Sequence, residues 1–247
     1  CVIFSFENHV LSIKDKSDRL YEFSSETVFD VKDGAWKFDL LLDLQDTMRG
    51  LGAIHNAIMD AHDFLMNKVG WERDAIQIRW PVSGSFSYYE VNSIGLNISE
   101  VLKIIGGDEW RRVAMLHVYG YAVMTSAYGN DLNKIPFGEF KGTHYMFTVS
   151  DREFAMSTGW AEFIEAAVDD NALNVTGYIN ADIPNIESNK WWTGDVAGNG
   201  SNTHGEIVEG AVASVLWDIT DTADSHDTTP GVDDDGISDM FSQLWEI

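Results

Sequence analysis

The segment from about Trp110 to Tyr128 constrains the fold most, because it is apolar on nearly every side. A helix that is hydrophobic all round has no face to present to water, so it belongs in the centre of a core. We therefore expect one central helix with other elements packed around it. Its apolar residues are Trp110, Val113, Ala114, Leu116, Val118, Tyr119, Ala122, Val123 and Met124.

Three other segments repeat their apolar residues at helical spacing. They run from Asp43 to Val69, from about Asp151 to Asp169, and from Gly205 to about Ile219. A short final helix is expected at the end of the chain. The third segment contains small residues that let another helix approach it closely, namely Gly210, Ala211, Ala213 and Ser214.

Strands are expected before the central helix. Residues 28–31 and 36–40 alternate apolar and polar side chains, and Asp33-Gly34 between them predicts a β-hairpin. Residues 75–81 also alternate and end at Pro81, which is typical of an edge strand. The order of elements predicts an α+β fold with an N-terminal β-rich segment over residues 1–43 and a mainly helical domain over residues 44–247.

The charge balance excludes several classes of partner. The 247 residues include 40 acidic and 16 basic side chains, for a net charge of −24. Such a surface repels phosphate backbones and anionic lipids, so we expect no binding to nucleic acid. It suits a secreted or surface protein, a salt-rich habitat, or a protein that binds divalent cations. No apolar run approaches the roughly 20 residues that a transmembrane segment needs.

The cysteine content, the first residues and three sequons bear on the location of the protein. Cys1 is the one cysteine, so no disulfide can form within the chain. The first residues lack a basic and an apolar signal region, so we expect any signal peptide to lie outside this sequence. A mature lipoprotein begins with Cys, although an arbitrary start of the sequence explains Cys1 equally well. Sequons mark candidate glycosylation sites at Asn97, Asn174 and Asn199.

Two motifs carry a resemblance to a known family. Residues 116–124 read L-H-V-Y-G-Y-A-V-M, and residues 158–163 read T-G-W-A-E-F. The sequence resembles secreted zinc metallopeptidases of the gluzincin type, in which the first motif would read H-E-Y-G-H-A-V-M and the second contains G-W-A-E. Residues 205–218 resemble a late helix of the same proteins. Over residues 44–247 the resemblance implies a zincin-like (thermolysin-like) fold, with His117 and Glu162 at the first and third zinc-ligand positions.

The sequence departs from this family at the residues that carry the chemistry. Val118 stands where the catalytic glutamate would be, and a valine cannot accept a proton from a metal-bound water. Tyr121 stands where the second histidine would be, and a neutral phenol is a poor zinc ligand. Loss of the base alone costs on the order of 10²–10⁴ in rate. We therefore expect a vestigial site at His117 and Glu162, without zinc and without peptidase activity.

The residues also allow other interpretations. A single histidine in an apolar helix is commonly a core residue that is hydrogen-bonded to a neighbour, and His117 fits that description. Glu162 shares the polar side of its helix with Thr158, Glu165 and Asp169, so it fits a solvated face as well as a ligand position. An active zinc metallopeptidase with a rearranged ligand set is the alternative, in which Tyr121, His144 or His204 completes the metal site.

The acidic tail offers a different ligand chemistry. Calcium takes six to eight oxygen ligands from flexible loops, and aspartates supply such oxygens. The spacing does not match an EF-hand loop, and a solvated acidic loop is the alternative. A third hypothesis is therefore that the chain is a surface domain that calcium stabilises and that has no other function. The candidate calcium ligands are Asp218, Asp221, Asp224, Asp227, Asp233, Asp234 and Asp235.

Together these features predict a non-catalytic secreted or cell-surface protein with a metallopeptidase-like fold. We expect it to act as a structural module or to bind a peptide or protein segment. An exposed sheet edge can accept an added strand through backbone hydrogen bonds, without any metal. The same geometry allows copies of the chain to assemble with one another.

Overall fold

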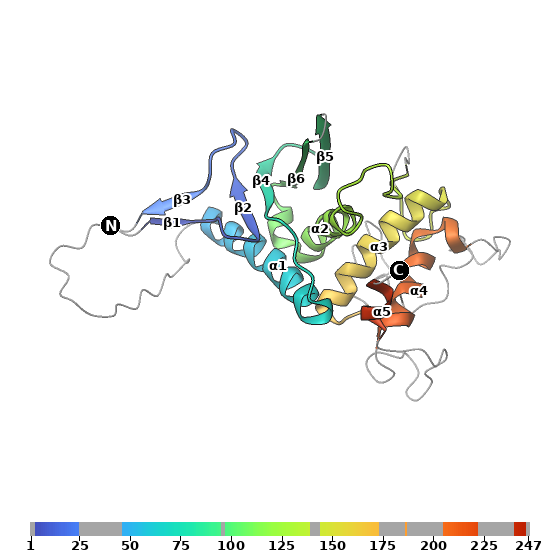
Figure 1. The fold of residues 1–247 in the computed structure, drawn as a ribbon. Helices are drawn as coiled ribbons and strands as arrows, with labels where there is room; N and C mark the ends of the chain where they lie inside the picture. Colours follow the sequence, from blue (N-terminus) through green and yellow to red (C-terminus); the bar gives the residue numbers. More distant parts are fainter. Residues whose placement is uncertain are drawn as a thin grey trace. The chain divides into compact units, whose positions relative to one another are not determined.

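A computed structural model describes residues 3–24, 46–94, 97–138, 144–172, 186, 205–221 and 240–245 (Figure 1). The chain divides into two compact units. The first contains Cys1–Met59 and Arg73–Met115, and the second contains Asp60–Glu72 and Leu116–Ile247. The architecture is mixed α/β, with a small sheet and several helices. The predicted hairpin at Asp33-Gly34 and the predicted boundary after residue 43 lie outside the described residues.

The first unit is built on a four-stranded sheet. Its central pairings, β2 with β4 and β4 with β6, are parallel, while β5 pairs with β6 in the antiparallel direction. Two short strands, β1 (Ile3–Ser5) and β3 (Glu22–Ser24), form a separate antiparallel pair. In spatial order the sheet consists of β2 (Leu11–Lys14), β4 (Ile76–Val82), β6 (Asn97–Ile105) and β5 (Tyr88–Ile94).

The strand that ends near Pro81 is not an edge strand, contrary to the prediction. β4 lies between β2 and β6, and the edges of the described sheet are β2 and β5. Pro81 is tolerated because the pairing with β6 is irregular between Arg79 and Val82, where a missing N–H interrupts little. The β5–β6 hairpin was not predicted, although residues 97–105 contain the β-branched and apolar side chains typical of strands.

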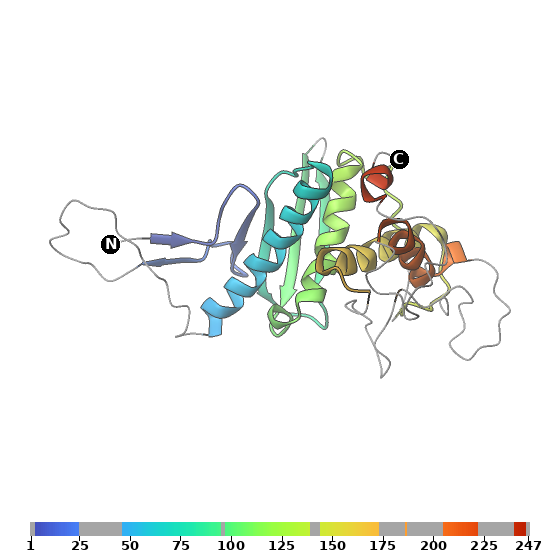
Figure 2. The ribbon, with the colours of Figure 1, turned by 90° about the horizontal axis from the view of Figure 1, so that it is seen from below.

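The core of the first unit lies between this sheet and the first part of α1 (Asp46–Val69), which runs across one face of the strands (Figure 2). Burial alternates along β4, as the sequence pattern indicates for a strand with one buried face. Helical spacing brings one stripe of α1 against the strands. The fully buried members of this core include Leu11, Ile13, Leu51, Ile54, Ile58, Ile76, Ile78 and Leu102.

A tight contact between α1 and β4 leads to a first prediction. A Cβ atom added at Gly50 would lie 2.9 Å from Cζ2 of Trp80, whose Nε1 donates a hydrogen bond to Glu109 over 3.2 Å. The indole therefore cannot swing aside without losing that bond. We expect Gly50→Ala to lower the free energy of unfolding by ~1–3 kcal/mol, measured by urea denaturation, although alanine is the better helix former.

The control for this prediction is Gly106→Ala. The added Cβ there would lie 3.6 Å from Pro81, which is an ordinary van der Waals contact. An unchanged unfolding midpoint for Gly50→Ala would contradict the close packing of α1 on Trp80.

The second unit is helical, and its helices follow the sequence predictions closely. The central segment forms α2 (Arg112–Ala127), which belongs to the second unit from Leu116 onward, and Leu116, Tyr119 and Val123 are fully buried. A 3-10 turn, η1 (Asp108–Trp110), precedes it in the first unit. The remaining elements are α3 (Arg152–Asp169), the 3-10 turn η3 (Gly205–Ile207), α4 (Glu209–Thr220) and α5 (Phe241–Trp245).

Glycines bring three of these helices into close contact. A Cβ at Gly120 of α2 would lie 2.9 Å from Cα of Ala161 in α3. A Cβ at Gly159 of α3 would lie 2.6 Å from the carbonyl oxygen of Glu209 and 2.7 Å from Cβ of Val212, both in α4. The predicted close approach of another helix to α4 is therefore confirmed, and α3 lies between α2 and α4.

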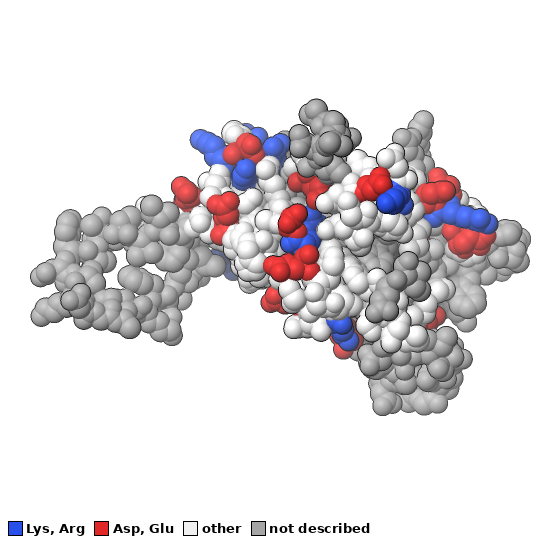
Figure 3. All heavy atoms as spheres, viewed as in Figure 1, with Lys and Arg blue, Asp and Glu red and all other residues white. Residues whose placement is uncertain are grey.

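Charged groups are scattered over the described surface. On the face shown in Figure 3, acidic and basic side chains lie next to one another in several places, separated by uncharged surface. Among the described residues, no helix combines the length and hydrophobicity that crossing a membrane requires.

Candidate functional site

His117 on α2 and Glu162 on α3 lie close together in the second unit. Glu165, one helical turn further along α3, joins them, and one ligand atom from each of the three residues lies within 4.8 Å of the others. All three side chains are buried. The two residues that the resemblance assigns to the first and third ligand positions thus meet in the structure, together with the carboxylate of Glu165.

The packing of α3 explains why this cluster is buried. The Nε1 atom of Trp160 donates a hydrogen bond to the carbonyl oxygen of Gly120 over 3.1 Å, which fixes α3 against α2. Thr158, Glu162 and Glu165 are three, four or seven positions apart, so they share one helix face. Because that face lies in the helical core, the interpretation of Glu162 as part of a solvated face is wrong.

Two imidazoles bind two of the buried carboxylates. The Nδ1 atom of His117 lies 2.5 Å from Oε1 of Glu165, as the interpretation of His117 as a hydrogen-bonded core histidine expects. The Nδ1 atom of half-buried His144 lies 2.9 and 3.1 Å from the two carboxylate oxygens of Glu209, the first residue of α4. His204, the other histidine considered for a rearranged site, lies outside the described residues.

Electrostatics tie the three carboxylates into one cluster. Burial raises the pKa of Glu162 well above its ordinary value, and the negative charges of Glu165 and Glu209 raise it further. Burial also raises the pKa of Glu209, against the opposing effect of the hydrogen bond to His144. The Oε2 atom of Glu162 is buried and has no hydrogen-bond partner. Glu162 is therefore the least compensated member of the cluster.

Val118 and Tyr121 lie on α2 at the positions that the resemblance assigns to the catalytic base and the second histidine. Val118 is 2% exposed and belongs to the apolar core. The hydroxyl of Tyr121 donates a hydrogen bond to Oγ1 of Thr158 over 3.0 Å, and burial raises the pKa of this phenol above its ordinary value. Tyr121 therefore stays protonated and remains hydrogen-bonded to Thr158. The ligand set of two histidines and one glutamate does not fit these residues.

Most of the chain matches the model of a known protein family. Residues 66–246, more than half of the chain, match the mycolysin C-terminal domain. The chain belongs to the mycolysin C-terminal domain family. This membership relates it to thermolysin-like peptidases. His117, Tyr121 and Glu162 lie inside the part that matches the mycolysin C-terminal domain, as do Glu165 and Glu209. No curated protein matches the chain.

The other candidate residues lie mostly outside the described part of the chain. Asp218 belongs to α4 and Asp221 caps its C-terminus, where its backbone N–H bonds to the carbonyl of Trp217. Asn97 begins β6. The remaining candidates for calcium binding and glycosylation lie outside the described residues, namely Asp224, Asp227, Asp233, Asp234, Asp235, Asn174 and Asn199. Calcium binding by the tail stays a prediction.

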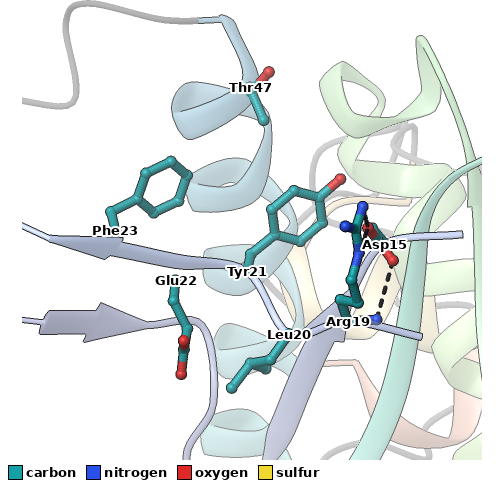
Figure 4. A pocket seen from close by; sticks show the side chains of 7 residues that line it. All are labelled: Asp15, Arg19, Leu20, Tyr21, Glu22, Phe23 and Thr47. Atoms are coloured by element: carbon teal, nitrogen blue, oxygen red, sulfur yellow. Dashed lines mark hydrogen bonds and ion pairs between the residues drawn. The ribbon is translucent and has the colours of Figure 1, made fainter. Parts of the chain in front are cut away.

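The first unit contains a pocket of about 400 Å³ beside β3 and the start of α1 (Figure 4). Asp15 and Arg19 on its wall form an ion pair of 2.6 Å, so their charges are already compensated. The hydroxyl of Tyr21 donates to the carbonyl of Trp80. These groups form no catalytic or metal-binding set, and the candidate site is therefore the buried cluster in the second unit. The pocket is lined by Asp15, Arg19, Leu20, Tyr21, Glu22, Phe23 and Thr47.

Proposed function

We propose that this chain is a secreted or cell-surface domain with a zincin-like (thermolysin-like) fold that binds a peptide or protein segment without hydrolysing it. The observation that carries the proposal is that α2 has Val118 and Tyr121 at the positions that the resemblance assigns to the base and the second histidine. The acidic composition, the sequons and the relationship to peptidases support an extracellular setting.

Hydrolysis of a peptide bond at a metal needs a group that accepts a proton from water. Val118 has no such group, and Tyr121 keeps its proton. Glu165 and Glu209 are each bonded to an imidazole. These side chains therefore support a structural role for the buried cluster rather than a role in peptide hydrolysis.

The edge of the sheet in the first unit supports binding. In the described sheet β5 has β6 on one side and no strand on the other. Tyr88, the first residue of β5, is 36% exposed, and Phe86, two residues before the strand, is 58% exposed. An extended segment can pair with such an edge through its backbone while its side chains contact exposed aromatic rings. The segment comes either from another protein or from a second copy of this chain.

This function can be tested with fluorescein-labelled casein as the probe. We expect the zinc-supplemented protein to leave casein intact while a zinc peptidase used as positive control degrades it. Casein fluorescence polarisation should rise as the protein is added. The combined change Phe86→Ser and Tyr88→Ser should weaken this binding on the order of tenfold, because exposed aromatic anchors dominate such contacts.

Tyr128→Ser is the matched control, since Tyr128 is 41% exposed but belongs to the second unit. Equal loss of binding in the control and in the β5 variant would argue against docking at β5. Casein fragments that disappear when Glu162 is replaced by glutamine would instead establish the alternative, an active metallopeptidase with a rearranged ligand set. The specific observation that favours this alternative is the presence of Glu165 beside His117 and Glu162.

A further inference from the structure

We infer that the centre of the second unit binds one divalent transition-metal cation through His117, Glu162 and Glu165. This ligand set differs from the two histidines and one glutamate of the peptidases that the sequence resembles. The cation joins α2 to α3, so its role is to stabilise the helical unit, and the inference is independent of whether the chain binds peptides.

The balance of charge in the cluster is the first argument. Glu162, Glu165 and Glu209 are 2%, 0% and 1% exposed. The ion pairs described for them are with His117 and His144. Two imidazoles and three acidic side chains therefore share one buried centre, in which no ion pair is described for Glu162. A buried charge without a counterion is costly, and a bound cation removes that cost.

The second argument is the unsatisfied carboxylate oxygen. Buried polar atoms nearly always have a hydrogen-bond partner, so an exception needs an explanation. The Oε2 atom of Glu162 is such an exception. The same side chain brings a ligand atom to within 4.8 Å of ligand atoms of His117 and Glu165. A metal ion bound by the imidazole and the two carboxylates would give this unpaired oxygen a partner.

The donor types indicate the class of cation. Calcium and magnesium take oxygen ligands, whereas imidazole together with carboxylates suits zinc, manganese or iron. For a given set of such ligands, zinc binds more tightly than manganese. Tyr121 is not a ligand in this arrangement, because its hydroxyl is bound to Thr158. Glu209 is hydrogen-bonded to His144, and its charge acts on Glu162 beside the site.

The inference is tested on the full chain after removal of metals with a chelator. Equilibrium dialysis against Zn²⁺ or Mn²⁺, followed by elemental mass spectrometry, should give one ion per chain, with zinc the tighter. The melting temperature should rise with either ion. Glu162→Gln and Glu165→Gln should each weaken zinc binding about 100-fold or more, since even residues that only support a ligand contribute about 10–100-fold.

Tyr121→Phe is the matched control, because it changes the same cluster without removing a proposed ligand. It should leave zinc affinity unchanged, and far-ultraviolet circular dichroism of each metal-free variant should match the parent. Three results would overturn the inference: no zinc or manganese bound by the parent, unchanged zinc affinity in both glutamate variants, or loss of zinc binding in Tyr121→Phe. The casein experiment tests the proposed function separately, so either proposal can fail without the other.

Discussion

Replacing Gly159 with alanine is expected to lower the free energy of unfolding by ~3 kcal/mol, near the upper end of what overpacking costs. The new Cβ would lie 2.6 Å from the carbonyl oxygen of Glu209 and 2.7 Å from Cβ of Val212. A backbone carbonyl cannot rotate away as a flexible side chain can, so α4 must move as a whole. Urea denaturation followed by circular dichroism measures the effect.

Gly205→Ala provides the control in the same unit. Its added Cβ would lie 3.5 Å from Cβ of Ala211, which is an ordinary contact. We expect a change within about 0.5 kcal/mol for this variant, as for most substitutions without a clash. If the two variants unfold at the same urea concentration, α3 and α4 do not pack through Gly159 as described.

The second large effect concerns the pH dependence of the metal-free protein. The pKa of Glu162 is raised in the folded state by burial and by two neighbouring carboxylates. The folded chain therefore binds more protons than the unfolded chain at pH values above the ordinary pKa of 4.5. The contribution of Glu162 to the free energy of unfolding is therefore fully present below pH 4.5, and it is lost as the pH rises above that value. For one proton the loss is about 1.4 kcal/mol per pH unit, until the pH passes the raised pKa of the folded state.

Glu162→Gln tests this assignment, because glutamine has nearly the same shape and carries no charge. The variant should lose the part of the pH slope that one proton supplies above about pH 5, as measured by urea denaturation at each pH. Glu90→Gln is the control. A hydrogen bond from Lys103 lowers the pKa of Glu90, so this residue is ionised in both states over that range. Parallel curves for the parent and Glu162→Gln would show that Glu162 holds no extra proton.

The helices were predictable because their signals are local. The all-apolar segment became α2, and the stripe that begins after Asp151 became α3. Asp151 accepts a hydrogen bond from the backbone N–H of Phe154, which is the N-cap contact that aspartate supplies. Apolar periodicity and caps depend on neighbours in the sequence, so a single sequence is enough to locate them.

The sheet order and the membership of the site depend on packing between distant segments. Pro81 suggested an edge strand, but the irregular pairing that accommodates it involves β6, some twenty residues later. In the sequence alone, Glu162 and Glu165 are typical of a solvated helix face. In the fold this face is buried, because α2 and α4 approach α3 closely at Gly120 and Gly159. The signal that could have selected Glu165 is its i+3 spacing from Glu162, since both then point to the same side of α3.

Glu209 and His144 show the same limit for a different reason. Glu209 is a buried acid at the start of a helix of small and apolar residues, and His144 precedes α3 in the chain. Their hydrogen bond joins positions that are 65 residues apart. Only the folded structure shows that they share the electrostatic environment of Glu162.

Anomalous X-ray diffraction from crystals grown with zinc tests the central claim most directly, because it locates the metal and the tyrosine in one experiment. We predict a single zinc peak among His117, Glu162 and Glu165, with the hydroxyl of Tyr121 still bonded to Thr158. A second unit without zinc at these residues, or a zinc ion bound by the oxygen of Tyr121, would contradict the proposed binding of a metal ion by His117, Glu162 and Glu165.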